Sequence, residues 1–413
     1  MLSLLRQPKL LRFYFAHGQS QLGTGASYVA LVLIAYQRLH SGWAVALVLL
    51  SEFLPGVVLA PYFGVLADRH SRRTLAIAAE VIRAGAFLGL VVISSFTATV
   101  ALALLAGVGT ALFRPAVNAA LPGLVTPEER SPATALYGAL KNLGFTLGPA
   151  LCGLVVMLGP ASWVLAGNAA TFVISAALLA GVPLGRAGED AGGEGAEPRS
   201  AWRDAKLGAR YAARERRVGA LMLIVAMTVL CGALINVAEP LLAIGPLHAG
   251  GSGFSILMTL YGLGMVAGAA YTARLGSRIS VLRAHFLAGV AMTGVAMLAC
   301  AAAGSLAGAL APFAIAGFAN VVIINPQIRL LQELVAGQLR GRVFGLLDSL
   351  ECSCFAIAFL AAGALLTAIG PRALYVLSGA LLLATAVFGL GLFRAPDSAD
   401  AVRHDALAAA EAA

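Results

Sequence analysis

A single carboxylate, Glu52, lies in the middle of an apolar stretch that runs from about residue 44 to residue 66. It precedes Gly64 by twelve residues, which is about 18 Å along a helix. An ionised side chain at that depth in hydrocarbon costs several kcal/mol unless it is paired or wetted. Glu52 is therefore a candidate for a carboxylate that takes up and releases a proton. The alternative is a structural partner for a basic group.

Other charged and amide side chains interrupt the apolar stretches without an obvious partner in the sequence. The candidates for lining a cavity are Arg114, Asn118, Lys141 and Asn325. A cation there can bind an anionic group of a ligand or pair with an acid, whereas the asparagines can line the cavity or bond across helices. Glu80 and Arg83, three residues apart, can share one helix face and neutralise each other. We interpret them as a structural pair.

Composition places these residues in a bilayer. Apolar residues make up 60% of the 413 residues, charged residues only 11%, and the mean hydropathy is +0.89, which excludes a water-soluble globule with an ordinary polar surface. The five cysteines fall inside apolar stretches, so neither a disulfide framework nor a metal site is indicated. No phosphate-binding loop of the Walker type occurs. We therefore expect no cofactor, no metal and no nucleic-acid partner.

Apolar stretches of about 20 residues are long enough to cross a bilayer as helices. Twelve can be placed, near residues 13–36, 44–66, 75–94, 98–121, 134–157, 162–182, 218–238, 253–275, 284–303, 306–326, 343–367 and 373–393. The predicted organisation is an N-terminal bundle (1–182), a linker (183–217), a C-terminal bundle (218–393) and a tail (394–413). Within the linker, Trp202, Leu207 and Tyr211 alternate with basic residues and favour an amphipathic helix on the membrane surface.

The distribution of basic residues predicts the orientation. With the N-terminus inside, 23 of the 28 lysine and arginine residues fall in cytoplasmic segments, and only Arg38 and Arg372 fall in external ones. This bias is the one that cytoplasmic loops carry. We expect a multi-pass protein of a bacterial inner membrane, with both termini and the linker in the cytoplasm.

The connection between the second and third stretches carries a charge cluster. It reads Gly64-Val-Leu-Ala-Asp68-Arg69-His-Ser71-Arg72-Arg73. This pattern resembles the signature loop of the major facilitator superfamily of secondary transporters, with Ser71 in place of a glycine. The resemblance implies an all-α membrane protein of twelve transmembrane helices in two pseudo-symmetric six-helix bundles. The alternative is a loop that is basic merely because it is cytoplasmic.

In that family the loop forms a charge cluster with the eleventh helix and helps to set which face of the carrier is open. By this resemblance Asp68, Arg69, Arg72 and Arg73 belong to a cytoplasmic gate. The acids and arginines at the start of the eleventh stretch are expected to join it; they are Arg340, Arg342, Asp348 and Glu351.

The fifth stretch contains a second motif, Gly144-Phe-Thr-Leu-Gly148-Pro149-Ala-Leu-Cys152-Gly153. It resembles the antiporter signature of drug and metabolite exporters, although Cys152 replaces one glycine. Small residues let helices approach closely and an internal proline bends a helix, so Gly144, Gly148, Pro149 and Gly153 are predicted to form a helix-bend motif. Ordinary packing of small residues is the alternative.

Two further segments resemble the branch that contains macrolide efflux proteins and the enterobactin exporter. They are Pro115-Ala-Val-Asn-Ala-Ala-Leu-Pro122 and Leu339-Arg340-Gly341-Arg342-Val343-Phe344-Gly345. The chain departs from many relatives at Thr24, where they have an acid. We therefore predict a monomeric secondary transporter, not an enzyme, that exports a small, partly hydrophobic molecule such as a drug, siderophore or secondary metabolite in exchange for protons. The alternative is an uncoupled facilitator or a lipid-flipping carrier of the same fold.

Overall fold

The computed structural model describes residues 4–185, 210–276, 278–335 and 337–392, and within these ranges the chain folds into helices. The first half contains α1 (Pro8–Leu39), α2 (Gly42–Val58), α3 (Ala60–Arg69), α4 (Arg72–Val92), α5 (Phe96–Leu124), α6 (Arg130–Leu158) and α7 (Ser162–Ala180). The second contains α9 (Arg216–Ile244), α10 (Gly250–Thr272), α11 (Ile279–Ala302), α12 (Leu306–Leu334) and α13 (Gly337–Leu392). Short 3-10 turns cover Leu4–Arg6 and Pro127–Glu129.

These helices account for twelve crossings of a bilayer. Eight helices in the described residues are long and apolar enough to cross a bilayer individually, and α1 and α6, with 32 and 29 residues, also have the required length. The second crossing is divided into α2 and α3 by a break at Leu59, because Pro55 lies inside α2 and another proline opens α3. The predicted all-α, twelve-helix fold is confirmed.

The 56-residue α13 contains the last two crossings. Its helices join at Gly370, whose φ of 75° and ψ of 171° interrupt the helical backbone. A glycine adopts such a positive φ at little cost, and Pro371 then restarts a helix from its first turn. The sequence predicted a connection at this place, between residues 367 and 373.

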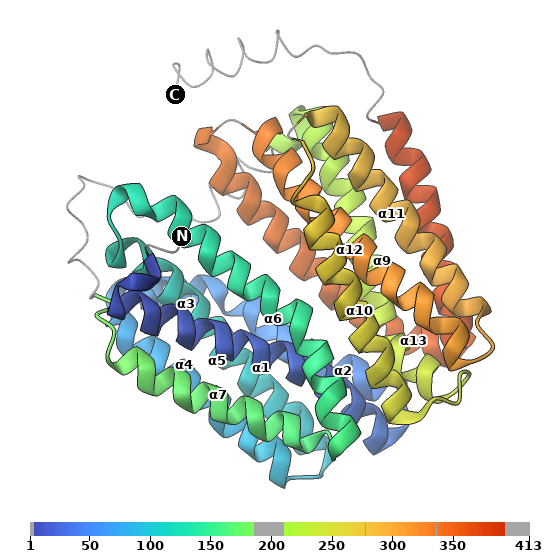
Figure 1. Cartoon of the computed structure of the whole chain (residues 1–413), viewed down its shortest axis with the longest axis horizontal. Coiled ribbons are helices and arrows are strands. Elements are labelled where there is room, and N and C mark those ends of the chain that lie inside the picture. Colours follow the sequence, from blue (N-terminus) through green and yellow to red (C-terminus); the bar gives the residue numbers. More distant parts are fainter. Residues whose placement is uncertain (1–3, 186–209, 277, 336, 393–413) are drawn as a thin grey trace.

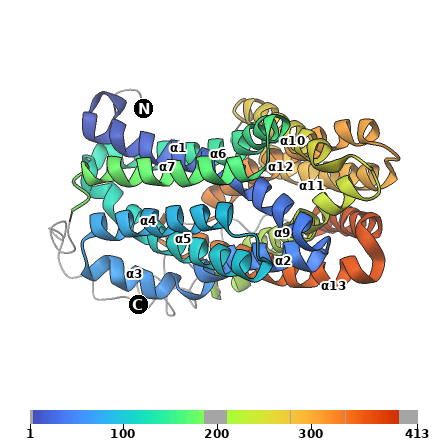
Figure 2. The same ribbon diagram turned by 90° about the horizontal axis from the view of Figure 1, so that it is seen from below.

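The helices pack as two groups. In the first, α1 contacts α6 and α7, and α4 contacts α5 and α7; in the second, α9 and α11 contact α13, and α10 and α11 contact α12. Figures 1 and 2 show the groups side by side, with α2 reaching across to α13. The principal contacts between the halves are those of α6 with α10 and of α2 with α13.

We call the end of the molecule where α1 begins the terminal end, and the end where α1 finishes and α2 begins the far end. The halves converge toward the far end and diverge toward the terminal end (Figure 1). Side-chain contacts agree with this arrangement. A side chain added at Gly363 of α13 would meet the Trp43 ring of α2, and the Phe53 ring stacks on Phe355 with centroids 5.4 Å apart.

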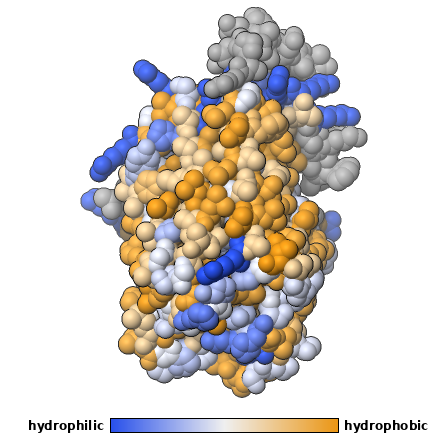
Figure 3. Space-filling view, turned by 90° about the vertical axis from the view of Figure 1, so that its right-hand side faces the viewer, coloured by the Kyte–Doolittle hydropathy of each residue, from blue (hydrophilic) through white to orange (hydrophobic). Residues whose placement is uncertain are grey.

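The surface suits a hydrocarbon environment. Apolar side chains cover much of the flank in Figure 3, whereas hydrophilic ones gather near its upper edge and in a smaller patch below. Many large apolar residues are exposed, such as Val92 at 82% and Leu158 at 81%. An exposed apolar surface of this extent is stable in lipid and not in water.

Internal prolines fall at matching places in the two halves. Pro115 lies inside α5 and Pro326 inside α12, which are the fourth crossings of their halves. The linker's predicted amphipathic helix begins at residue 201 and so lies mostly outside the described residues, as does the tail. The domain boundaries stay predictions.

Candidate functional site

Two pairs of oppositely charged side chains, which we call the charged walls, lie on opposite halves of the molecule. On the first half, Arg114 of α5 is exposed and Lys141 of α6 is half-buried; on the second, Asp348 of α13 is exposed and Glu351 is half-buried. Lys141 interacts electrostatically with Arg114 and also with Asp348 and Glu351 across the two halves. The structure therefore brings Arg114 and Lys141, which the sequence had left without partners, near two acids that were predicted to belong to the cytoplasmic gate.

The surroundings of these groups hold one acid in place. Glu351 accepts a hydrogen bond of 3.0 Å from the Gln327 amide of α12, a partner that sequence reasoning missed. Asn118 of α5 is exposed. Asn325 instead donates a 2.7 Å hydrogen bond to the Thr272 hydroxyl of α10, so it bonds across helices, one of the two roles considered for it.

The residues predicted for the cytoplasmic gate lie at the terminal end. Arg69, Arg73 and Arg340 are exposed, and Arg72 and Arg342 are half-buried. Arg340 donates from Nε to the Val335 carbonyl at 3.0 Å. The side chain of Asp68 lies outside the described part of the chain. The gate therefore stays a prediction.

Glu52 lies where the halves meet. Its neighbour Phe53 contacts both Phe355 and Phe359 of α13, with ring centroids 5.4 and 5.7 Å apart. Gly107 of α5 packs directly on the Glu52 carbonyl, so the backbone is held firmly. The Oε2 atom of Glu52 is buried, and no described residue bonds to it. This one oxygen is thus enclosed and unpaired, whereas Glu52 as a whole is half-buried.

A second acid was missed by the sequence analysis. Glu239 follows the predicted seventh stretch, 218–238, by one residue, but α9 continues through Pro240 to Ile244. Its side chain is half-buried and interacts electrostatically with Tyr28 of the other half. The apolar residues after the proline, Leu241 to Ile244, were the available signal that the helix extends past the acid.

The predicted pair of Glu80 and Arg83 is confirmed. Glu80 Oε2 and Arg83 NH2 lie 2.6 Å apart, and the Ser175 hydroxyl of α7 donates to Glu80 Oε1 at 2.6 Å. The guanidinium lies 4.4 Å from the ring centres of both Phe113 and Phe172. The pair is buried within the first half and serves its packing.

The glycines of the fifth crossing let α6 approach two neighbours closely. A Cβ at Gly144 would lie 2.5 Å from the Gln21 carbonyl carbon of α1, and one at Gly148 would lie 2.5 Å from the Ala26 nitrogen. Gly153, nearer the far end, meets Ser255 and Thr259 of α10 in the other half. Pro149 is buried inside α6. The helix therefore packs tightly on its own half and touches the opposite half at one end.

Replacing Gly153 by valine is expected to weaken the far-end contact. A Cβ there would lie 2.9 Å from the Ser255 carbonyl oxygen, so α6 and α10 must separate. Spin labels on the far ends of α6 and α10 are expected to show a larger share of long distances. Gly167→Val is the control, because a Cβ at Gly167 meets nothing within 4 Å. Identical distance distributions in both variants would contradict this account.

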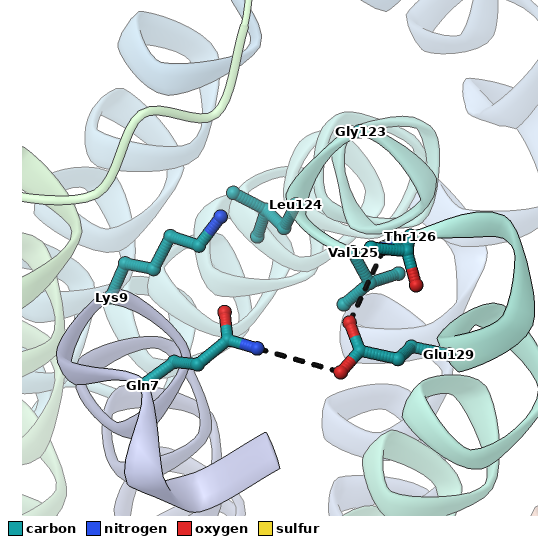
Figure 4. Close-up of a pocket in the computed structure, with 7 residues that line it drawn as sticks. All are labelled: Gln7, Lys9, Gly123, Leu124, Val125, Thr126 and Glu129. Carbon is teal, nitrogen blue, oxygen red and sulfur yellow. Dashed lines mark hydrogen bonds between the residues drawn. The ribbon is translucent and has the colours of Figure 1, made fainter. Parts of the chain in front are cut away.

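A shallow pocket of about 210 Å³ opens at the terminal end of the first half. In Figure 4, Gln7 and Lys9 extend from the start of α1 toward the end of α5. The Gln7 amide donates to Glu129 Oε1 at 3.5 Å, and the Thr126 amide donates to Glu129 Oε2 at 3.3 Å. These bonds tie the start of α1 to the connection between α5 and α6.

Twelve crossings in two halves, with charged walls between them, define a membrane transporter and not an enzyme. The chain belongs to the Major Facilitator Superfamily, because the model of that family matches residues 13–218 and 221–408. The relationship therefore extends over both halves.

Named relatives include efflux proteins. Macrolide efflux protein A of Streptococcus pyogenes is 24% identical over 368 residues, which cover 87% of this chain and 89% of the relative. The uncharacterized MFS-type transporter YfiS of Bacillus subtilis is 27% identical over 376 residues, 88% of each chain.

Solved structures resemble the fold. The nucleoside transporter NupG aligns with a TM-score of 0.73 at 12% identity, covering 94% of this chain and 100% of that one. An auto inhibited POT family peptide transporter aligns with a TM-score of 0.70 at 14% identity, covering 95% and 98%. At these identities the likeness concerns the fold alone.

Proposed function

We propose that this transporter exports a small, partly hydrophobic molecule by alternating access, in exchange for protons. The enclosed, unpaired Glu52 oxygen beside the aromatic contact between the halves is the observation that carries the proposal. The similarity to macrolide efflux protein A supports export of a drug-like or metabolite-like compound. The protein would act as a monomer in a bacterial inner membrane.

The terminal end faces the cytoplasm in this proposal. Basic residues concentrate in the segments assigned to that side, as they do in cytoplasmic loops. The halves diverge toward that end (Figure 1), so this conformation would receive its substrate from the cytoplasm or the inner leaflet. The contacts of Phe53 with α13 and of Gly153 with α10 would then have to open to release it.

Glu52 would carry the proton. An ionised carboxylate inside a bilayer is stable only when it is wetted or paired. When the halves close around Glu52 the neutral form is favoured, and when water reaches it the ionised form is favoured. Its position next to Phe53 makes this exchange of water depend on the contact between α2 and α13.

The charged walls would close the terminal end. Lys141 and Arg114 face Asp348 and Glu351 across the halves. Opposite charges attract more strongly as the space between them narrows and loses water. We propose that these groups, with the arginines of the predicted gate, hold the terminal end shut when the far end opens.

An uncoupled carrier or lipid-flipping protein is the second candidate. Thr24 of α1, the position at which the resemblance to drug exporters implies an acid, donates a 2.8 Å hydrogen bond to the Ser20 carbonyl of its own helix. This position holds no proton-exchanging group. If Glu52 is not the coupling group either, transport would be independent of a proton gradient.

Transport by everted membrane vesicles tests the proposal. Wild-type vesicles should accumulate members of a panel of hydrophobic cations, macrolides and siderophores only under an imposed pH gradient. Glu52→Gln is expected to bind the same compounds but to lose gradient dependence, with about a hundredfold lower driven accumulation, because a glutamine cannot carry the proton.

Glu333→Gln is the matched control, since Glu333 is exposed in the last turn of α12 at the terminal end. It should behave as the wild type. Gradient-driven accumulation that survives in Glu52→Gln would remove the assigned role from Glu52. Accumulation by the wild type without any gradient dependence would favour the uncoupled carrier.

A further inference from the structure

A pocket of about 390 Å³ opens between α10 and α12 at the terminal end. Its lining mixes polar and apolar side chains, which are those of Ala269, Thr272, Ala273, Leu275, Asn325, Ile328 and Arg329. One turn before Thr272 the two helices are in close contact, because a Cβ at Gly268 would lie 2.6 Å from the Phe318 carbonyl oxygen. The pocket therefore does not continue between the helices toward the far end. Its volume is in the range of small-molecule sites, about 300–1,000 Å³.

The pocket lies on the side of α10 that faces the first half. Nearer the far end, Ser255 and Thr259 of α10 meet Gly153 of α6. Ala273 follows Ser255 by 18 residues, which is about five turns of an α-helix, so these two residues share one face. The pocket therefore belongs to the surface that the second half presents to the first. It is reached from the terminal end, where the halves diverge (Figure 1).

Arg329 supplies a positive charge that is held in place at this pocket. Its NH1 atom donates a 3.1 Å hydrogen bond to the Leu275 carbonyl, just beyond the end of α10, and the residue is half-buried. Among the described residues, Arg329 makes no other hydrogen bond and no ion pair. A guanidinium carries five N–H donors, so its Nε and NH2 atoms remain for a bound group.

The polar side chains beside Arg329 are fixed as well. Thr272 is only 3% exposed and donates to the Gly268 carbonyl at 2.9 Å. Asn325 donates to the Thr272 hydroxyl at 2.7 Å, which ties α12 to α10. A group that reaches Arg329 therefore meets side chains that need little further ordering, and this lowers the entropic cost of binding.

The sequence around the pocket contains no competing acid. Between Glu239 and Glu333 it has four arginines and no aspartate or glutamate. Besides Arg329, these arginines lie in or beside the connection from α10 to α11; they are Arg274, Arg278 and Arg283. Glu333 follows Arg329 by one turn of α12, but no ion pair joins them in the part of the chain that the structure describes. The local charge therefore favours an anion.

We propose that this pocket binds the anionic head, a phosphate or a carboxylate, of an amphipathic molecule. The Nε and NH2 atoms of Arg329 can pair with either group through two parallel hydrogen bonds. Leu275 and Ile328 offer apolar surface to the part of the molecule that follows the head. Capping the end of α10 would account for one donor of Arg329, but not for a pocket of this size. The inference goes beyond the proposed export and holds whether or not transport is coupled to protons.

Binding of dodecyl phosphate to the purified full-length protein in a neutral maltoside detergent tests this site by calorimetry. Arg329→Gln is expected to weaken binding by about 30-fold or more, because a hydrogen-bonded charge pair loses one partner. Arg274→Gln is the matched control, since it removes the same charge from an exposed residue outside the lining. It should change the affinity by less than about threefold, because exposed charges are screened by salt.

Two comparison ligands separate the contributions of the head and the chain. Dodecanol, which has no charge, should bind the wild type and Arg329→Gln alike. Inorganic phosphate, which has no chain, should bind the wild type at least about tenfold more weakly than dodecyl phosphate, because it buries no apolar surface.

Ala273→Leu keeps Arg329 and adds side-chain atoms to the pocket lining. It should weaken dodecyl phosphate binding by about tenfold or more, while the melting temperature in detergent stays near that of the wild type because Ala273 is exposed. This variant carries the test if Arg329→Gln does not fold.

Several results would overturn the anion site. They are unchanged binding of dodecyl phosphate in Arg329→Gln or Ala273→Leu, an equal loss in Arg274→Gln, and inorganic phosphate that binds as tightly as dodecyl phosphate. A wild type that exports compounds of the panel but binds no dodecyl phosphate would also overturn it and leave the transport proposal standing. Failed export with intact binding of dodecyl phosphate would remove only the transport proposal.

Discussion

Replacing Gly148 by alanine is expected to destabilise the first half severely. The added Cβ would lie 2.5 Å from the Ala26 nitrogen and from the Gly25 carbonyl carbon. Both are backbone atoms of α1, which cannot move aside as a side chain can. Overpacking of this kind costs about 1–3 kcal/mol or more. The variant should melt at a lower temperature in detergent than the wild type and yield less monodisperse protein.

Gly138→Ala is the matched control, because Gly138 lies on the same helix and a Cβ there meets nothing within 4 Å. Alanine is the better helix former by about 0.8–1.0 kcal/mol, so this variant should melt at the same or a higher temperature. Similar melting temperatures for the two variants would show that α1 and α6 are not held by this close approach.

The helices and their number could be predicted from the sequence because length and apolarity are local properties. The short connection before Pro371 was predicted at the place where Gly370 interrupts α13. The break of α2 at Leu59 was not, although Pro55 was visible, because a proline inside a membrane helix can bend it without dividing it.

The candidate site was predicted only in part, since one sequence does not fix how each helix is rotated about its axis. The interaction of Lys141 with Asp348 and Glu351 depends on how two separate halves approach each other. Glu239 was missed because the apolar window ended one residue before it. The partner of Asn325 could not be chosen from the sequence, since Thr272 lies on another helix.

The ion pair of Glu80 and Arg83 was predictable because its partners are three residues apart on one helix. Its surroundings were not. Phe113 of α5 and Phe172 of α7 enclose the guanidinium from two sides, and Ser175 adds a hydrogen bond. These contacts come from helices distant in sequence, and they make the pair a junction between α4, α5 and α7.

Glu80→Gln is expected to be among the most destabilising single substitutions in the chain. It leaves the buried Arg83 guanidinium, whose side chain is 7% exposed, without its counter-charge. Removing one member of a buried ion pair typically costs about 3–5 kcal/mol. A marked drop in melting temperature is expected even though glutamine has nearly the size of glutamate and can still bond to Ser175.

The double variant Glu80→Gln/Arg83→Met separates charge burial from packing. Methionine fills the space between Phe113 and Phe172 and contacts aromatic rings favourably, while no charge remains unpaired. Its melting temperature should lie well above that of Glu80→Gln and near the wild type, because an apolar replacement of a buried pair is often neutral or stabilising. If the double variant is no more stable than Glu80→Gln, the loss comes from the packing of α4 against α7 and not from an uncompensated charge.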